Sequence, residues 1–227
     1  MGEALGRRSN ATVRNPRFCG FSRIVALFAA LLASPCFLIE PVQAQTTVML
    51  PEPAAPLALI GWADPTHAWS EFCLRLPREC AVDTSERTVV ALSPEVMHTL
   101  LTVNREVNTS IRPVTDREHW NVEDRWDFAE DGAGDCEDFQ LVKRRRLVAA
   151  GLPRRALRMT VVIDDEGLGH AVMMVRTDRG DFILDNKRNT VLAWQQTGYL
   201  FVKREGQDSS TWVALEGVTS PIVTANR

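Results

Sequence analysis

The chain has 227 residues, of which 45% are hydrophobic and 24% charged, with 13 glycines and 12 prolines. This composition is typical of a globular protein and excludes collagen-like, coiled-coil and broadly disordered chains. Because 26 basic residues face 29 acidic ones, the net charge is −3, and the chain lacks the basic excess that a nucleic-acid partner requires.

The first 44 residues have the pattern of a secretory signal peptide. Five arginines and a single acid precede an apolar run over residues 24–39, and Val42-Gln43-Ala44 forms a small-x-small cleavage site. The run contains Pro35 and is shorter than the ~20 apolar residues of a membrane-spanning helix, which leaves an uncleaved anchor as the alternative. We therefore expect cleavage after Ala44 and a periplasmic or secreted protein.

Three cysteines would remain after that cleavage. Cys73 and Cys80 are separated by six residues, near enough to close a short loop as a disulfide in an oxidising compartment. Cys136 is then the odd one, and it is either a buried inert side chain, an intermolecular link or a reactive thiol.

The mature chain begins with a proline-containing stretch, residues 45–60, which we interpret as an extended N-terminal arm before a single domain over residues 61–227. A helix is predicted from Pro94, with Ser93 as N-cap and an apolar stripe made by Val96, Leu100, Val103 and Val107. Residues 108–134 read as a long structured loop, rich in acids and aromatics. A second helix is predicted from Asp135-Cys136 to about Ala150, where Gly151 and Pro153 end it.

The rest of the chain is predicted to form β-strands. Five β-branched or aromatic runs, separated by hairpin-sized turn signals, cover residues 157–163, 170–176, 181–184, 198–202 and 211–215. Helices followed by consecutive hairpins predict an α+β domain in which helices pack on one face of an antiparallel sheet.

Cys136 occupies the point where a glycine-containing loop, Gly132-Ala133-Gly134, turns into the second helix. The positive end of a helix dipole favours a thiolate there. Asp135, Glu137 and Asp138 oppose the thiolate unless a cation offsets their charge.

His170 and Asp185 supply a base and its orienting acid. They lie on successive predicted strands, and pairing them centres the hairpin between Thr177 and Asp178, where the turn signal lies. We expect the carboxylate on Nδ1 of the imidazole, which leaves Nε2 for Cys136. The alternative is a buried cysteine with an unrelated strand histidine.

These residues resemble a known family, the bacterial transglutaminase-like cysteine proteinases, which include the periplasmic LapG-type proteases that release surface adhesins. The matching text is Gly134-Asp-Cys136-Glu-Asp-Phe139 with Lys143 and Leu147-Val-Ala-Ala-Gly151-Leu-Pro153, then Gly169-His170-Ala-Val, then Leu184-Asp185-Asn186. The resemblance implies a papain/transglutaminase-like core with Cys136 as nucleophile, His170 as base and Asp185 as orienting acid. It also implies a protein substrate, with a surface adhesin as one candidate and an inner-membrane protein as a candidate regulator.

Carboxylates gather around the expected nucleophile. Asp124, Asp135, Glu137 and Asp138 offer hard oxygen ligands, for which calcium is the natural cation, although the spacing does not fit an EF-hand loop. LapG-type relatives are similar in requiring calcium beside the catalytic cysteine. The alternative is a solvated acidic surface, while zinc is disfavoured because Cys73 and Cys80 lack ligand spacing and His67 is isolated.

Several other features have ordinary interpretations. We expect Arg144 and Arg145 on a solvated helix face, Lys143 against the acidic cluster, and Trp120 and Trp126 in the core. His67 and His119 have no evident partners in the sequence.

Together these patterns predict an exported cysteine endopeptidase that acts through a Cys136 thioester, with calcium at the adjacent carboxylates. A transamidase would use the same triad but release the acyl group to an amine. A non-catalytic, calcium-dependent binding module would keep the fold and need no reactive thiol. The oligomeric state is not predicted.

Overall fold

The computed structural model describes residues 50–216, which belong to a compact unit from Gln45 to Arg227. The expected signal peptide, residues 1–44, lies outside the described residues, as do both ends of the mature chain. Among the described residues, no helix is both long and apolar enough to cross a membrane.

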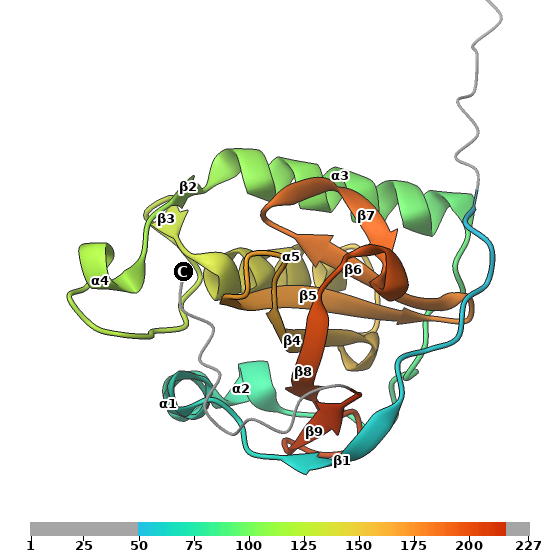
Figure 1. Ribbon diagram of the computed structural model, residues 1–227, viewed down its shortest axis with the longest axis horizontal. Coiled ribbons are helices and arrows are strands. Elements are labelled where there is room, and N and C mark those ends of the chain that lie inside the picture. The colour runs from blue at the N-terminus through green and yellow to red at the C-terminus, as the bar shows by residue number, and fades with distance from the viewer. Residues whose placement is uncertain (1–49, 217–227) are drawn as a thin grey trace, which may run out of the picture. The chain divides into compact units, whose positions relative to one another are not determined.

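A seven-stranded sheet organises the domain, in the order β1-β9-β8-β4-β5-β6-β7, and every neighbouring pair is antiparallel (Figure 1). Its strands are β1 (Leu59–Ala63), β4 (Leu157–Ile163), β5 (Gly169–Thr177), β6 (Gly180–Asp185), β7 (Arg188–Ala193), β8 (Leu200–Glu205) and β9 (Trp212–Leu215). A small parallel pair joins β2 (Arg112–Pro113) to β3 (Ala133–Gly134).

All five predicted strands are present as β4, β5, β6, β8 and β9, whereas β1 and β7 were not predicted. β1 takes in the last two residues of the expected arm. Just before it, the buried Leu57 donates its backbone N–H to the Asp181 carboxylate at 2.8 Å, so the end of the arm packs onto the sheet.

The helices are α1 (His67–Arg75), α2 (Pro77–Cys80), α3 (Pro94–Ser110), α4 (Asp116–His119) and α5 (Cys136–Ala149), with short 3-10 turns η1 (Arg154–Ala156) and η2 (Trp194–Gln196). The Ser93 hydroxyl caps α3 by accepting from the Val96 N–H at 3.2 Å, as predicted. α5 ends where Gly151 adopts φ +91°, a conformation that favours glycine. Both predicted helices are therefore confirmed.

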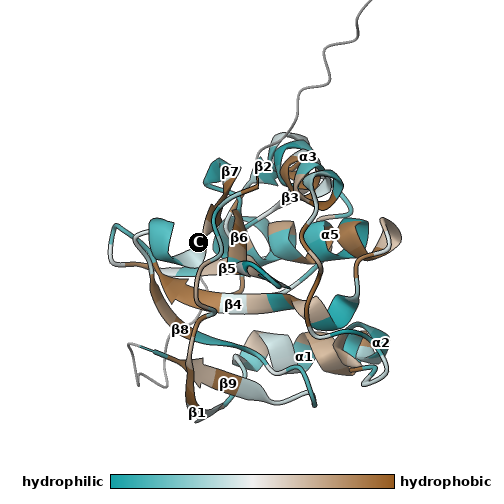
Figure 2. Cartoon of the chain, turned by 90° about the vertical axis from the view of Figure 1, so that its right-hand side faces the viewer, coloured by the Kyte–Doolittle hydropathy of each residue, from teal (hydrophilic) through white to brown (hydrophobic). Residues whose placement is uncertain are grey.

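Apolar residues cover the two faces of the sheet differently. The larger cluster joins one face to α1, α3 and α5, since Phe72, Leu100 and Phe139 belong to the same cluster as Met173 of β5. Figure 2 shows these helices on the same side of the strands. The smaller cluster, which includes Val172, contains no residue of an α-helix. Because neighbouring strand residues point to opposite faces, the predicted α+β arrangement with helices on one face is confirmed.

Residues 108–134, expected to form a long structured loop, contain the end of α3 and the short elements β2, α4 and β3, joined by irregular segments. The two tryptophans of this stretch differ. Trp126 is fully buried and packs edge-on against Trp69 and Trp212, with ring centroids 5.1 and 6.4 Å away. Trp120 is 40% exposed, with the Arg125 guanidinium 4.5 Å from its ring centroid, so its predicted core position is wrong.

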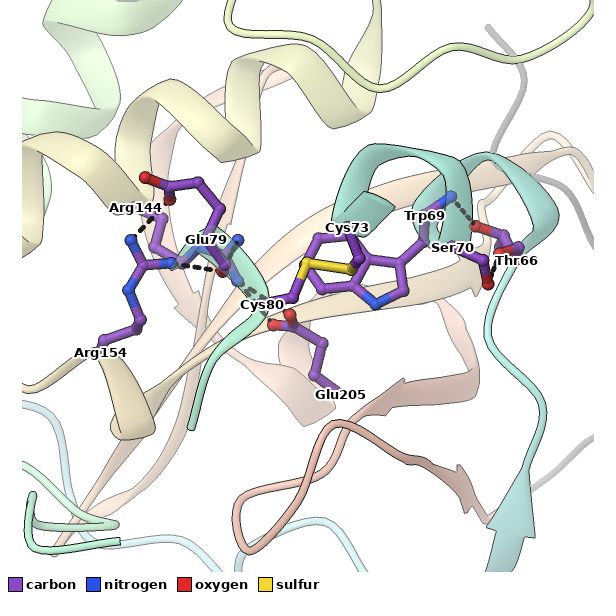
Figure 3. The surroundings of a disulfide bond; sticks show 9 residues. All are labelled: Thr66, Trp69, Ser70, Cys73, Glu79, Cys80, Arg144, Arg154 and Glu205. Carbon is purple, nitrogen blue, oxygen red and sulfur yellow. Dashed lines mark hydrogen bonds and ion pairs between the residues drawn. A yellow bond between two sulfur atoms is a disulfide. The ribbon is translucent and has the colours of Figure 1, made fainter. Parts of the chain in front are cut away.

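The Cys73–Cys80 disulfide links α1 to α2, in agreement with the spacing (Figure 3). Beside it, the backbone oxygen of Glu79 accepts hydrogen bonds from Arg144 at 3.3 Å and Arg154 at 2.7 Å. Arg144 is only 1% exposed and pairs with both carboxylate oxygens of Glu205 at 2.8–2.9 Å, so its expected solvated position is wrong. α1 and α2 cover this face of α5, which the sequence of α5 alone does not show.

Candidate active site

Cys136 is the first residue of α5, directly after β3 and the N-cap residue Asp135. Its buried side chain lies against β5, where the Ala171 backbone N–H points at Sγ at 3.4 Å. The thiol also donates to Glu137 Oε2 at 3.1 Å. The sulfur therefore has a helix N-terminus and a backbone donor on one side, which favour negative charge, and a carboxylate on another, which opposes it.

His170 and Asp185 meet at the start of β5 and the end of β6, with Nε2 2.9 Å from Oδ1. The register differs from the expected one by two residues. Thr177 pairs with Gly180 and Met173 with Leu184, so the turn centres between Asp178 and Arg179. Extending this register would place Asp185 diagonally across from His170, on the same face of the sheet, and the two side chains still reach each other.

The imidazole is held the opposite way round from our prediction. Asp185 contacts Nε2, which leaves Nδ1 as the ring nitrogen for Cys136. The geometric reason is reach, because Nε2 lies farther from the backbone than Nδ1 and can span the diagonal to Asp185.

The three side chains influence one another's charge. Burial disfavours the imidazolium, but the hydrogen bond that His170 donates to Asp185 and the contact with Cys136 outweigh it and raise the pKa of His170 to about 9. Burial likewise opposes the Asp185 carboxylate, yet the hydrogen bond and charge of His170 lower its pKa to about 2. His170 and Asp185 therefore form an ion pair at neutral pH.

An acidic group surrounds the other side of Cys136. Ligand atoms of Asp116, Asp135 and Glu137, all buried, lie within 4.8 Å of one another. Asp124 joins them through its interaction with the Glu137 side chain. Asp116 was missed as a ligand candidate. The sequence showed it only as one acid among many in the stretch before Cys136, and α4 and β3 bring it beside Asp135, whose Oδ2 accepts its backbone N–H at 3.3 Å.

Ionising several of these buried carboxylates at once is strongly unfavourable. Burial, reinforced by neighbouring acids, raises the pKa of Asp124 to about 6 and that of Asp135 to about 7. Burial and the charges of Cys136 and Asp135 raise the pKa of Glu137 well above its usual range. These shifts are the expected consequence of gathering acids in a buried place, where a bound cation would offset their charge.

The donor set fits a calcium ion. Each of the four side chains keeps one buried carboxylate oxygen without a hydrogen-bond partner, namely Asp116 Oδ1, Asp124 Oδ1, Asp135 Oδ1 and Glu137 Oε1. Calcium takes six to eight oxygen ligands in flexible geometry, so four carboxylates from α4, the following loop and the start of α5 suit it.

Two of the other expected residues occupy different surroundings. Asp138, like Asp124, is not one of the three residues whose ligand atoms lie within 4.8 Å of one another. Its Oδ1 accepts the Asp127 backbone N–H at 2.6 Å, while its buried Oδ2 has no hydrogen-bond partner. Lys143 does not contact the acidic cluster as expected. It is fully buried, and the charge that acts on it is that of Asp185.

The isolated histidines also differ. His119, for which the sequence showed no partner, pairs with Asp131 at 2.7 Å. His67 is exposed and lies 3.8 Å from Glu71.

A cysteine at a helix start, facing a histidine–carboxylate pair on an antiparallel sheet, is the arrangement of a thiol hydrolase. The comparison with protein families is more specific, because residues 60–220 match the family described as bacterial transglutaminase-like cysteine proteinase. The chain therefore belongs to this family, and it is a transglutaminase-like cysteine peptidase with a protein substrate.

Solved structures of LapG from Legionella pneumophila are similar to this chain. The calcium-bound structure is 27% identical, covers 55% of this chain and 73% of its own, and has a TM-score of 0.46. The EGTA-treated structure is 28% identical, with coverage of 55% and 69% and the same TM-score. No match was found among the curated proteins.

Proposed function

We propose that the chain is an exported, calcium-dependent cysteine endopeptidase that uses Cys136 as nucleophile, His170 as base and Asp185 as orienting acid. The observation that supports this most directly is the buried His170–Asp185 pair, whose ring contacts the cysteine at the start of α5. The geometry supports the roles that the family resemblance implies, with the two ring nitrogens of His170 exchanged relative to our prediction.

In the proposed reaction, His170 holds the proton of the Cys136 thiol as an imidazolium, in line with its raised pKa, and the thiolate attacks the carbonyl carbon of the scissile peptide bond. The carbon–sulfur bond forms as the carbonyl π electrons move onto the oxygen. When this oxyanion collapses, the carbon–nitrogen bond breaks, and His170 gives its proton to the leaving amine. Water then attacks the thioester, giving a proton to His170 and releasing the Cys136 thiolate. The Cys136 backbone N–H at the helix start is a donor for the oxyanion.

The acidic group influences the proposed nucleophile because Glu137 contacts the Cys136 thiol. Asp116, Asp124, Asp135 and Glu137 would hold the calcium ion, with Asp138 supporting them through the Asp127 backbone. The ion supplies positive charge that offsets the carboxylates next to the nucleophile. The EGTA-treated and calcium-bound states of the LapG structures support the choice of ion.

The substrate and the location of the protein follow from the sequence. A signal peptide cleaved after Ala44 would deliver the peptidase to the periplasm or beyond, where the Cys73–Cys80 disulfide is stable. A cell-envelope or surface protein, including an adhesin, is then the substrate within reach, and an inner-membrane protein could regulate the enzyme. N-terminal sequencing of the exported protein tests the cleavage site, and a mature chain that still begins at Met1 would refute it.

The triad is tested with a thiol-directed probe and a peptide-cleavage assay. Wild-type protein should label rapidly at Cys136 and cleave the substrate, while Cys136→Ala and His170→Ala should each lose turnover because the residues act as a unit. Near-wild-type cleavage by Cys136→Ala would overturn the proposal. An added primary amine that appears in the product would instead identify a transamidase.

Calcium dependence is tested by mutation of the acidic group. Asp135→Asn should weaken calcium binding and lower activity, with Glu130→Gln as control, because Glu130 is an exposed acid paired with Arg145 at 2.8 Å. Unchanged calcium affinity in Asp135→Asn would count against the site.

A further inference from the structure

Tyr199, the only tyrosine of the chain, lies beside the proposed triad without belonging to any motif of the sequence. It follows η2, immediately before β8, and is 9% exposed. Its hydroxyl donates a hydrogen bond to Asp185 Oδ2 at 2.7 Å. This short contact to an ionised acceptor is of the strong, charge-assisted kind.

This hydrogen bond completes the set of hydrogen bonds around the Asp185 carboxylate. Oδ1 faces His170 Nε2 at 2.9 Å and accepts the Lys187 backbone N–H at 3.0 Å. Oδ2 is held by Tyr199. Since both oxygens are fixed, the carboxylate cannot rotate about its carbon–carbon bond without breaking a hydrogen bond.

Tyr199 is itself held in place. Its backbone N–H donates to Thr197 Oγ1 at 3.2 Å, and its ring packs in the smaller apolar cluster with Val172 and Phe201. The ring also stands edge-on to the His170 imidazole, with centroids 6.0 Å apart and planes at 86°. The tyrosine therefore contacts both the acid and the base of the proposed triad.

We propose that Tyr199 is a positioning residue, which fixes the Asp185 carboxylate so that Oδ1 stays aligned with His170. The kinetic consequence rests on the proposed function, while the effect on His170 does not. Other charged groups surround this pair and must be held constant: Lys143 of α5 and the Cys136 thiol act on Asp185 and His170, and Arg188 and Asp165 act on Tyr199.

The test is Tyr199→Phe, which removes one oxygen and keeps the ring. Peptide cleavage should show kcat reduced about tenfold or more with KM unchanged, because a hydrogen bond to a charged group is lost away from the substrate. In an Asp185→Asn background the same change should have no further effect, because Tyr199 acts through that carboxylate. Additive losses, or an unchanged kcat, would overturn the proposal.

A second readout separates this proposal from the proposed function. An NMR titration of His170 needs no substrate, and in Tyr199→Phe the pKa of the ring should fall by about one unit, back toward its ordinary value. The control is Trp194→Phe, which alters a neighbour of the same apolar cluster and should leave the titration unchanged. A lowered His170 pKa in a protein that cleaves nothing would support the positioning role and refute the peptidase, and an unchanged pKa would refute the positioning role.

If Tyr199→Phe does not fold, biosynthetic 3-fluorotyrosine serves instead, because a single tyrosine gives one fluorine signal at this position. That signal should shift with the same midpoint as the His170 titration. A fluorine signal that is indifferent to His170 would contradict the hydrogen-bonded chain.

Discussion

The charge on His170 depends on two neighbours, Asp185 and Cys136, which outweigh the cost of burying an imidazolium. The folded-state pKa of about 9 exceeds the ordinary value of 6.5, so the stability that the charged ring contributes is complete below pH 6.5 and is lost as pH rises through about 9. For Asp185 the sign is reversed, since its contribution is present above pH 3.8 and is lost as pH falls toward about 2.

Asp185→Asn should therefore destabilise the protein most between pH 3.8 and pH 6.5, and progressively less toward pH 9. It should also reduce kcat by roughly 100-fold or more, because the imidazole loses its orienting charge. Urea unfolding at pH 6 and pH 9, together with a pH–rate profile, measures both effects. A destabilisation that is the same at the two pH values would contradict the assigned ion pair.

Lys143 is a buried lysine with no hydrogen-bond partner for Nζ, and burial lowers its pKa to about 7. Because the unfolded chain holds this proton up to pH 10.5, the cost of burying the lysine is greatest below pH 7 and declines as pH rises. Lys143→Met should thus stabilise the protein, by about 2 kcal/mol more at pH 6 than at pH 9. Thermal melts at both pH values measure the difference, and a gain independent of pH would show that the folded protein keeps the lysine charged at both pH values.

Helix α5 illustrates how packing at the scale of an element changes the meaning of a residue. Two adjacent arginines, identical in the sequence, have opposite environments. Arg144 is buried against Glu205, and its guanidinium lies 5.3 Å from the Trp69 ring centroid, while the Arg145 side chain is 45% exposed and pairs with Glu130. The difference arises because α1, α2 and β8 cover one side of the helix.

Substituting each arginine with methionine tests this difference. Arg144→Met should cost about 3 kcal/mol of unfolding free energy, since it leaves the Glu205 carboxylate buried without its partner. Arg145→Met, the matched control one residue away, should cost less than about 1 kcal/mol, because exposed ion pairs are weak. Chemical denaturation of both variants gives the comparison, and equal costs would contradict the assigned burial.

At the scale of the whole molecule, the proposed site depends on segments that are distant in the chain. Asp116 comes from α4, Asp135 and Cys136 from the start of α5, His170 from β5 and Asp185 from β6. The acidic group therefore links the loop before α5 to the catalytic helix. Its raised carboxylate pKa values mean that the cation-free domain loses stability as pH rises from about 4 to about 7.

Chelated protein should accordingly melt at a lower temperature at pH 8 than at pH 5, where protons take the place of the cation. Restoring calcium should raise the melting temperature, and the gain should grow with pH as the carboxylates ionise. Magnesium should restore less, because it prefers strict octahedral geometry. A melting temperature that chelator does not change at pH 8, after metal analysis confirms that the ion was removed, would show that the acidic group does not bind a cation.

Local patterns in the sequence determined most of the secondary structure and the candidate triad. The caps and periodicity of α3 and α5, the alternation in β4 and β5 and the turn signals between strands are short-range, so they predicted the elements and the α+β class. The same reasoning selected Cys136, His170 and Asp185, because the helix start and the two strand ends carried distinctive residue types. The Cys73–Cys80 pairing was also accessible, since a loop of that length closes locally.

Only the tertiary structure decided the features that depend on which elements meet. Neither the two-residue shift in the β5–β6 register nor the choice of Nε2 for Asp185 is encoded in a local pattern, because the turn signal permits more than one pairing. The acidic group gained Asp116, and the triad gained a contact from Tyr199, across 19 and 14 residues of chain respectively. The burial of Arg144 and Lys143 has the same cause, since long-range packing alone determines which side of a polar helix is removed from water.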